Sequence, residues 1–354
     1  MIQANDFRRR WEDLREDALA AFETVGASGS YVLGEEVRAF EHALAALWGF
    51  PHAAGVASGL DAIEISLRAL GCGPGDRVLT APISAFATTL AIVKTGAVPV
   101  FVDTDDQGLI DLERCQELLK KRSDIRFFVP VHLYGFALDP DELLRLRDEH
   151  ALLMVEDCAQ SSSAAGDLAA ISFYPTKNLG AMGDGGAILM QDAALEARVQ
   201  ALRDYGQTAK YRHDVIGYNS RLDELQAALL RRACLPRLER WLSRRREIAA
   251  AYLEGIQNPA VRLPAPPAGS APSWHLFPVW VEPERRDAFT RHLGLGTHYP
   301  IAIPDQKALH SVRFEAPDGC ENARRLCASE ASLPIHPYLY DSEVAEVIAA
   351  VNSF

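Results

Sequence analysis

Short apolar runs alternate with amphipathic segments over much of the chain. Each run has the length of a buried strand, and the segments between the runs carry apolar residues at helical spacing. This alternation predicts an α/β fold with a mostly parallel sheet and helices on both of its faces. Ligands of such sheets bind beyond the carboxyl ends of the strands. The expected strands lie at 53–57, 77–81, 98–103, 126–135, 152–156, 169–174 and 186–190.

The pattern changes after the last of these strands. Residues 207–221 are polar and have no periodicity, which indicates a loop that is either mobile or functional. Pro236 should end or kink the helix before it. We therefore predict a large domain, residues 1–235, with an N-terminal helical arm, and a smaller α+β domain, residues 236–354. The other expected elements are helices at 7–24, 35–50, 192–206, 223–235, 237–256, 285–294 and 342–354, a strand at 274–282, a strand or turn at 297–304, and a helix with an extended segment at 321–339.

Composition narrows the class of protein. The 354 residues are 48% hydrophobic and 24% charged, as in ordinary globular proteins, and the net charge of -12 argues against nucleic acid or an anionic membrane as a partner. The start of the chain is polar, without a signal peptide, and no stretch suits a membrane span, so we expect a cytoplasmic protein. Scattered cysteines without a CxxC pair fit a reducing compartment and give no metal framework. They are Cys72, Cys115, Cys158, Cys234, Cys320 and Cys327.

The most informative polar residues lie between residues 152 and 190. Asp157 follows one expected strand, Ser172 lies in the next, and Lys177 follows that strand in a turn rich in Pro and Gly. A lysine between two buried strands is costly to desolvate, but a lysine with a lowered pKa is a good amine nucleophile that forms Schiff bases. An aspartate beside it could hold a pyridinium nitrogen protonated, as in proteins that bind pyridoxal 5'-phosphate (PLP). The alternative is ordinary: a solvated loop lysine and a helix-capping aspartate.

A second group of residues could complete such a site. Ser58 and Gly59 stand between a strand and a helix, an arrangement that can bind an anion through free backbone amides, although simple capping explains it equally well. His132 also lies at a strand end, so it can converge with Ser58 and Asp157. Phe86, in the first turn of a helix expected at 83–96, could cover a flat ring or could be an ordinary core aromatic.

Seven motifs are spread along the chain: SGLDA (58–62), VPVHLYG (129–135), VEDCAQ (155–160), SFYPTKNLGAMGDGGA (172–187), GYNSRLDELQAA (217–228), HYP (298–300) and SLPIHPYL (332–339). Taken together, they resemble the motifs of the DegT/DnrJ/EryC1/StrS group of PLP-dependent sugar aminotransferases. Any one motif is weak, but the set occurs in the family's order and covers nearly the whole chain. The resemblance implies PLP fold type I, like that of aspartate aminotransferase, with a mostly parallel seven-stranded sheet and a smaller α+β domain.

The resemblance also implies a role for each matching residue. Lys177 would bind PLP as a Schiff base and act as general base and acid, and Asp157 would pair with the ring nitrogen. Asn219 would reach the phosphate in the neighbouring subunit, which implies a homodimer with shared sites. Further cofactor contacts would come from Ser58, Gly59, Leu60, Phe86, Gln160 and Ser172, and the sugar nucleotide would be lined by Lys210, Tyr211, His298 and Tyr299.

The resemblance implies transfer of an amino group from glutamate to a nucleotide-linked keto sugar. The turn GDGGA (183–187) is more like that of members acting on dTDP-3-keto-6-deoxyhexoses than that of members acting on 4-keto sugars. Two departures concern the cofactor site: Leu60 replaces a common Thr, and the segment 161–171 is short. Alternatives are a 4-keto sugar or cyclitol aminotransferase, a PLP-dependent sugar dehydratase, in which a His commonly replaces the lysine, and a non-catalytic protein of this fold.

Overall fold

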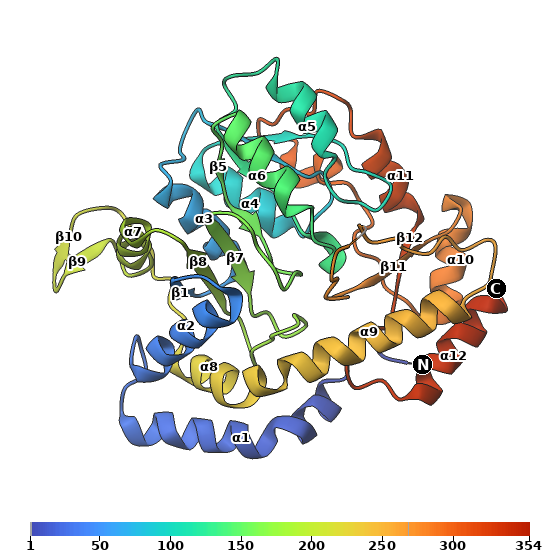
Figure 1. The fold of residues 1–354 in the computed structure, drawn as a ribbon, viewed down its shortest axis with the longest axis horizontal. Coiled ribbons are helices and arrows are strands. Elements are labelled where there is room, and N and C mark those ends of the chain that lie inside the picture. The colour runs from blue at the N-terminus through green and yellow to red at the C-terminus, as the bar shows by residue number, and fades with distance from the viewer. Residues whose placement is uncertain (1, 268) are drawn as a thin grey trace.

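Two helices precede the sheet in the computed structural model, which describes residues 2–267 and 269–354 (Figure 1). Helix α1 (Phe7–Ser28) begins after Asp6, whose carboxylate accepts hydrogen bonds from the amides of Arg8 and Arg9. Its buried residues recur along one face, which packs against α8 (Glu224–Leu229). Helix α2 (Glu35–Trp48) ends at Gly49, which has the left-handed conformation common at helix ends.

The sheet expected from the sequence forms the centre of the described residues. Strands β5 (Leu153–Met154) and β6 (Glu156–Asp157) are two halves of one strand, because the amides of Val155 and Asp157 continue its hydrogen bonds to the segment that contains β4. The sheet thus has seven strands in the order β1–β8–β7–β6/β5–β4–β2–β3, and β8 runs in the opposite direction to the other six. The remaining strands are β1 (His52–Val56), β2 (Arg77–Thr80), β3 (Val98–Phe101), β4 (Phe127–Val129), β7 (Leu168–Ser172) and β8 (Gly186–Met190).

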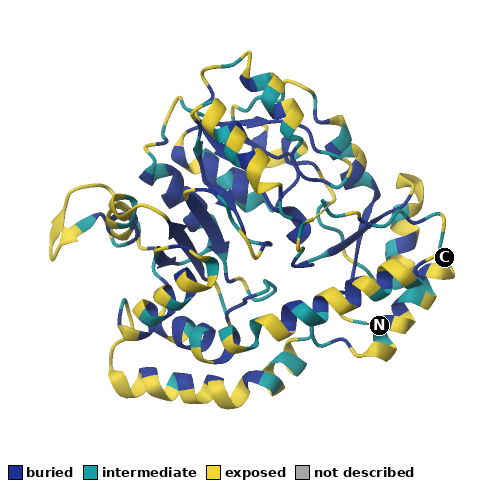
Figure 2. Cartoon of the chain, viewed as in Figure 1, coloured by how far each residue is buried: buried dark blue, intermediate teal, exposed yellow. Residues whose placement is uncertain are grey.

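Both faces of the sheet are buried. Leu79 and Phe128 belong to one hydrophobic core cluster, whereas Val78 and Phe127, their neighbours along the same strands, belong to another. Alternate side chains thus enter cores on opposite faces, as expected for parallel strands covered by helices. Figure 2 shows the strands as buried and the outer face of α1 as exposed. The connecting helices are α3 (Gly59–Ala69), α4 (Phe86–Thr95), α5 (Leu112–Leu119), α6 (Pro140–Glu149) and α7 (Ala193–Arg203).

The C-terminal part packs beside the sheet. After α8 the helical path changes to a π-helix, Leu230–Cys234, and then to a 3-10 turn, Leu235–Arg237, at Pro236. The long helix α9 (Leu238–Gly255) then crosses the molecule (Figure 1). Strands β11 (Phe277–Trp280) and β12 (Glu330–Leu333) form an antiparallel pair. Three more helices complete this part: α10 (Pro283–Leu293), α11 (Glu321–Ser329) and α12 (Asp341–Asn352).

Some expectations need correction. The segment 207–221 contains a hairpin, β9 (Gln207–Ala209) and β10 (Arg212–His213). It was not predicted, because the residue with positive φ in its turn is Tyr211, at 63°, where a glycine would have indicated a hairpin. Of the strand or turn expected at 297–304, the second alternative holds: the residues form bends that lead into a short 3-10 helix, Ile303–Asp305. Helix α4 begins at Phe86, so Ser84 precedes it.

One core cluster contains residues on both sides of position 235, so the division into domains 1–235 and 236–354 stays a prediction. Throughout residues 2–267 and 269–354, no helix combines the length and the apolar character that a membrane crossing requires.

Candidate active site

A cavity of about 500 Å³ opens at the carboxyl ends of β6 and β7, where the beginning of α3 meets the C-terminal part of the chain. Such a position is typical of ligand sites in α/β sheets, and the volume suits a small cofactor with its substrate. Segments far apart in the sequence meet there, including the N-terminal residues 4–5 and residues 332–333. Eight residues predicted from the sequence line it: Ser58, Gly59, Leu60, Asp157, Ser172, Lys177, His298 and Tyr299.

The turn that presents Lys177 is held by its own backbone and by helix α1. The amide of Lys177 donates to the carbonyl of Tyr174 at 2.8 Å. Gly180 allows a close approach, because a Cβ there would lie 2.4 Å from the carbonyl oxygen of Pro175. The guanidinium of Arg10 donates to that carbonyl at 2.9 Å and also to the carbonyl of Gly180. This clamp by Arg10 was not predicted from the sequence.

The surroundings of Lys177 favour its neutral amine. Burial lowers the pKa of Lys177 to about 8, although the nearby carboxylate of Asp157 opposes the shift. At pH 7 roughly one amine in ten is then neutral, compared with fewer than one in a thousand at the ordinary pKa of lysine. The lysine therefore has the electronic state that Schiff-base chemistry requires.

We expect PLP capture by the apoprotein to follow this titration. The neutral amine is the nucleophile, so the rate at which apoprotein takes up PLP should rise as pH increases from 6 to 8 and level off above about 8. The measurement is the rate of appearance of the bound cofactor's absorbance after PLP is mixed with apoprotein. A rate that keeps rising up to pH 10 would contradict the lowered pKa of Lys177.

Asp157 is fixed at the end of β6. Its Oδ2 accepts a hydrogen bond of 2.7 Å from the hydroxyl of Thr88, which is also 2.7 Å from the hydroxyl of Ser84. Its Oδ1 accepts from the amide of Ala159 at 3.1 Å. These hydrogen bonds hold the carboxylate in one position at the end of the strand. The role of Thr88 was not predicted, because nothing in the sequence separates it from the adjacent Thr89.

The beginning of α3 forms the anion-binding end of the cavity. The hydroxyl of Ser58 caps the helix by accepting from the amide of Asp61 at 3.1 Å, so the expected capping is present. The amides of Gly59 and Leu60 belong to the first turn, where helices leave N–H groups without intrahelical partners. A Cβ on Gly59 would lie 2.7 Å from the Cβ of Ser172, so glycine brings helix and strand together. This arrangement suits a phosphate.

Replacing Gly59 with alanine should weaken cofactor binding by about tenfold or more, because α3 and Ser172 must separate to admit the methyl group. Titration of apoprotein with PLP, followed by absorbance, measures the effect. Gly73→Ala is the matched control, since a Cβ on Gly73 would have no neighbour within 4 Å. Equal affinities in the two variants would count against the phosphate site.

Other predicted contacts lie behind the cavity wall. Gln160 accepts from the amide of Tyr134 at 2.6 Å and donates to the hydroxyl of Tyr299 at 3.1 Å, so it supports a lining residue. Phe86 packs against a core cluster, while its neighbours Ala85 and Ala87 line the cavity. The predicted contacts of Gln160 and Phe86 with the cofactor stay predictions.

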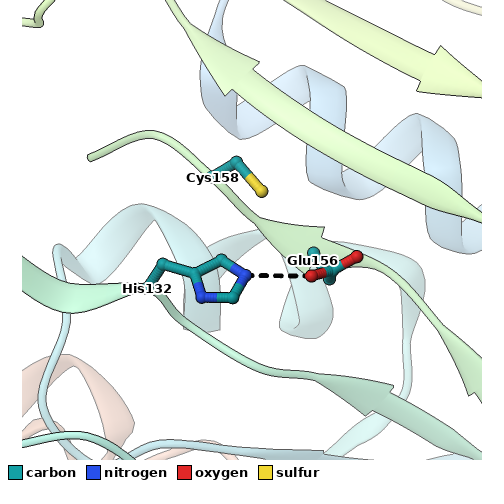
Figure 3. Close-up of side chains that lie close together, drawn as sticks. All are labelled: His132, Glu156 and Cys158. Atoms are coloured by element: carbon teal, nitrogen blue, oxygen red, sulfur yellow. Dashed lines mark hydrogen bonds and ion pairs between the residues drawn. The ribbon is translucent and has the colours of Figure 1, made fainter. Parts of the chain in front are cut away.

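His132 does not join Ser58 and Asp157, as the sequence suggested it could. It lies with Glu156 and Cys158 in a buried group (Figure 3). Its Nε2 is 3.0 Å from Glu156, and its Nδ1 accepts from the amide of Leu138 at 3.1 Å. Both ring nitrogens of His132 are thus already hydrogen-bonded. His132 and Glu156 therefore form a structural pair that does not need a metal ion.

The short segment 161–171 is tied to the same buried group. The carboxylate of Glu156 accepts from the amide of Ala165 at 2.9 Å and also from the amide of Gly166. A Cβ on Gly166 would lie 2.6 Å from a side-chain carbon of Met154, so this position needs glycine. Residues 161–167 therefore form a tight, anchored loop and not an open flap, and residues 168–171 belong to β7.

Three predicted residues lie away from the cavity of this chain. Lys210 and Tyr211 form the tip of the β9–β10 hairpin, which projects from the body (Figure 1), and Tyr211 is 84% exposed. Asn219 is exposed and lines a separate hollow. Asp184 borders both that hollow and the main cavity. The predicted roles of Lys210, Tyr211 and Asn219 therefore stay predictions.

Known proteins match the chain over nearly its full length. The model of the DegT/DnrJ/EryC1/StrS aminotransferase family matches residues 12–352. The dTDP-3-amino-3,4,6-trideoxy-alpha-D-glucose transaminase of Streptomyces venezuelae is 40% identical, over 99% of this chain and 95% of that protein. The UDP-N-acetyl-3-dehydro-alpha-D-glucosamine 3-aminotransferase of Acidithiobacillus ferrooxidans is 36% identical, over 98% and 96%. The solved structure of S. venezuelae DesV in complex with a ketimine intermediate has a TM-score of 0.94, with 39% identity over 98% of this chain and 96% of that one.

Proposed function

This chain belongs to the DegT/DnrJ/EryC1/StrS aminotransferase family, and from that premise we propose that it moves an amino group from glutamate to a nucleotide-linked 3-keto sugar. The observation that carries the proposal is one cavity that holds Lys177, with its lowered pKa, beside the fixed carboxylate of Asp157. A sugar dehydratase is not favoured, because the chain keeps Lys177 and the two relatives named above are aminotransferases.

The residues present fit PLP, the cofactor of this family. The first turn of α3, with Ser58, Gly59 and Ser172, suits the phosphate, and a Cβ on Gly59 would close that cradle. The carboxylate of Asp157, which lines the cavity, suits a protonated ring nitrogen. When bound, PLP supplies an electron sink that stabilises negative charge at the carbon bearing the amino group.

The protein's own contribution is to bind, orient and move protons. Lys177 Nζ can take a proton from the donor's α-carbon and return one at the sugar carbon, because a pKa of about 8 suits both directions near neutral pH. Thr88 and the amide of Ala159 hold the Asp157 carboxylate in position. The clamp by Arg10 on the turn keeps Lys177 in reach of both substrates in succession.

The charge of the cavity supports a homodimer with shared sites. Among the described residues that line it, Lys177 is the only lysine or arginine. A nucleotide sugar carries a diphosphate and glutamate carries two carboxylates, so additional cations are needed for binding. The projecting hairpin offers Lys210 and Arg212, both exposed, and Asn219 lies at its base. We infer that these residues complete the site of the partner subunit.

Subunit mixing tests this arrangement. Lys177→Ala and Asn219→Ala dimers should each have little activity. After denaturation and refolding of an equal mixture, random pairing makes half of the dimers mixed, and each mixed dimer carries one intact site. We expect about a quarter of wild-type specific activity. Mixed dimers confirmed by mass that show no gain would exclude shared sites.

Two observations support a keto group at carbon 3 of the sugar. The turn GDGGA (183–187) resembles that of members acting on 3-keto sugars, and both relatives named above carry a 3-amino product or a 3-aminotransferase activity in their names. A panel of dTDP- and UDP-linked 3-keto and 4-keto hexoses with glutamate, read by mass, tests it. Amination of the dTDP-linked 3-keto-6-deoxyhexose is expected. Amination of 4-keto sugars alone would contradict it.

The cysteines support a location in the cytoplasm, which we include in the proposal. All six are free, buried thiols in the structure. Burial raises the pKa of each thiol, for Cys72 to about 11, so none has the reactive thiolate of a redox site. Six such thiols are typical of proteins in a reducing compartment.

A further inference from the structure

A hydrogen-bonded chain of three side chains runs from the interior to the cavity. Glu330, at the beginning of β12, is 1% exposed. One carboxylate oxygen, Oε2, accepts from the backbone amide of His298 at 2.6 Å, and the other, Oε1, accepts from the hydroxyl of Ser332. The same Ser332 hydroxyl is 2.8 Å from His298 Nδ1. His298 and Ser332 both line the cavity that holds Lys177.

The hydrogen-bonded side chains Glu330, Ser332 and His298 can hold their protons in two arrangements that satisfy every hydrogen bond among them. With Glu330 ionised, the Ser332 hydroxyl donates to it and therefore accepts from an Nδ1–H of His298, which leaves Nε2 as an acceptor. With Glu330 protonated at Oε1, the carboxyl donates to Ser332, and Ser332 donates to a bare Nδ1, so Nε2 carries the hydrogen. One proton separates the two states: it enters at Nε2, the Nδ1 proton moves to Ser332, and the Ser332 proton moves to Glu330.

The surroundings allow both states near neutral pH. Burial raises the pKa of Glu330 to about 7, although the hydrogen bonds from Ser332 and the His298 amide and the charge of Arg286 oppose the shift. Burial and the charge of Lys177 lower the pKa of His298, which favours the neutral ring, in which the tautomer matters. The titratable groups that face Glu330 and His298 from neighbouring elements are Arg286, Tyr134, Tyr299, Cys327, Lys177 and His275.

We infer that Glu330 is a positioning residue that acts through Ser332 to set whether His298 presents a hydrogen-bond donor or an acceptor to the substrate. The inference rests on the proposed function only for the identity of that substrate. In the ionised state, Nε2 of His298 accepts a hydrogen bond from a sugar hydroxyl or takes up a proton, and in the protonated state it donates a hydrogen bond.

The direct test reads the tautomer of His298 in PLP-loaded protein labelled with nitrogen-15 in histidine. Nitrogen chemical shifts distinguish protonated from bare ring nitrogens, and the His298→Asn variant identifies the resonances of His298. In the wild type at pH 8.5 we expect Nδ1–H. In Glu330→Gln the amide NH₂ must donate to Ser332, so we expect Nε2–H at every pH. The same tautomer in both proteins at pH 8.5 would overturn the inference.

A kinetic readout separates this role from a structural one. The ratio of wild-type to Glu330→Gln kcat/KM for the keto sugar, in which the titration of Lys177 cancels, should change by about three- to tenfold between pH 6 and 8.5, the effect of one hydrogen bond. A ratio that stays constant over this range would overturn the inference. If Glu330→Gln does not fold, Ser332→Ala breaks the same chain, and the His298 tautomer should become independent of pH in this range. A tautomer that still follows pH in Ser332→Ala would overturn the inference. The nitrogen shifts need no substrate, so an error in the proposed sugar would leave this test intact.

Discussion

Replacing Lys177 with alanine should abolish transamination and leave the protein folded. The amine is the only lysine side chain that lines the cavity among the described residues, and its lowered pKa matches the proton transfers required at carbon. Loss of the general base alone costs up to about 10⁴-fold, and loss of the Schiff base adds to it. Turnover measured with glutamate and the keto sugar should therefore fall by roughly four orders of magnitude or more.

The matched control is Lys120→Ala, which removes an exposed lysine after α5 and should leave turnover unchanged. Circular dichroism and thermal unfolding establish that both variants are folded. Because the wild-type cavity must keep a cation partly out of water below pH 8, Lys177→Ala should not lower the stability of the apoprotein at neutral pH. Substantial turnover in Lys177→Ala would end the mechanism proposed here.

Replacing Asp157 with asparagine should separate cofactor capture from catalysis. The carboxylate raises the pKa of Lys177, so its removal leaves a larger fraction of neutral amine, and apoprotein should capture PLP faster at pH 7. Turnover should nevertheless fall by about a thousandfold, because an amide cannot hold the ring nitrogen protonated. Thr88 can still donate to the Oδ atom of asparagine, so the fold should survive.

The two readouts are measured on the same preparation, capture by absorbance and turnover by product mass. Thr88→Val serves as the milder comparison, since it removes one hydrogen bond to the carboxylate and keeps the charge. We expect it to lose about tenfold or less. An Asp157→Asn enzyme with turnover close to wild type would show that this carboxylate does not control the cofactor.

The sheet was predictable because each strand of a parallel sheet is buried on both faces and is therefore a continuous apolar run. The direction of β8 was not evident from this pattern. It runs antiparallel to β7 because the connection 173–185 is a turn and contains no crossover helix. The hairpin β9–β10 was missed for a local reason, the positive φ of Tyr211 where sequence rules expect Gly or Asn.

The candidate site also has some residues that the sequence predicted and others that it did not. The sequence predicted that Lys177, Asp157 and Ser58 lie together, because each follows an expected strand, and all three line the cavity, while their roles stay predictions. Thr88, Arg10 and Glu330 were missed because their roles depend on which distant segments the fold brings together, and no spacing in the sequence carries that information. His132 shows the opposite error: its position at a strand end was correct, but its side chain pairs with Glu156.

The central claim is that PLP is held by Lys177, and borohydride reduction of the holoenzyme followed by peptide mass analysis tests it most directly. Reduction fixes the cofactor to the lysine that binds it. We predict a phosphopyridoxyl group on the peptide that contains Lys177, in full yield per subunit. A label on another of the chain's lysines, or no label on a yellow protein, would contradict the account. Those other lysines are Lys94, Lys120, Lys121, Lys210 and Lys307.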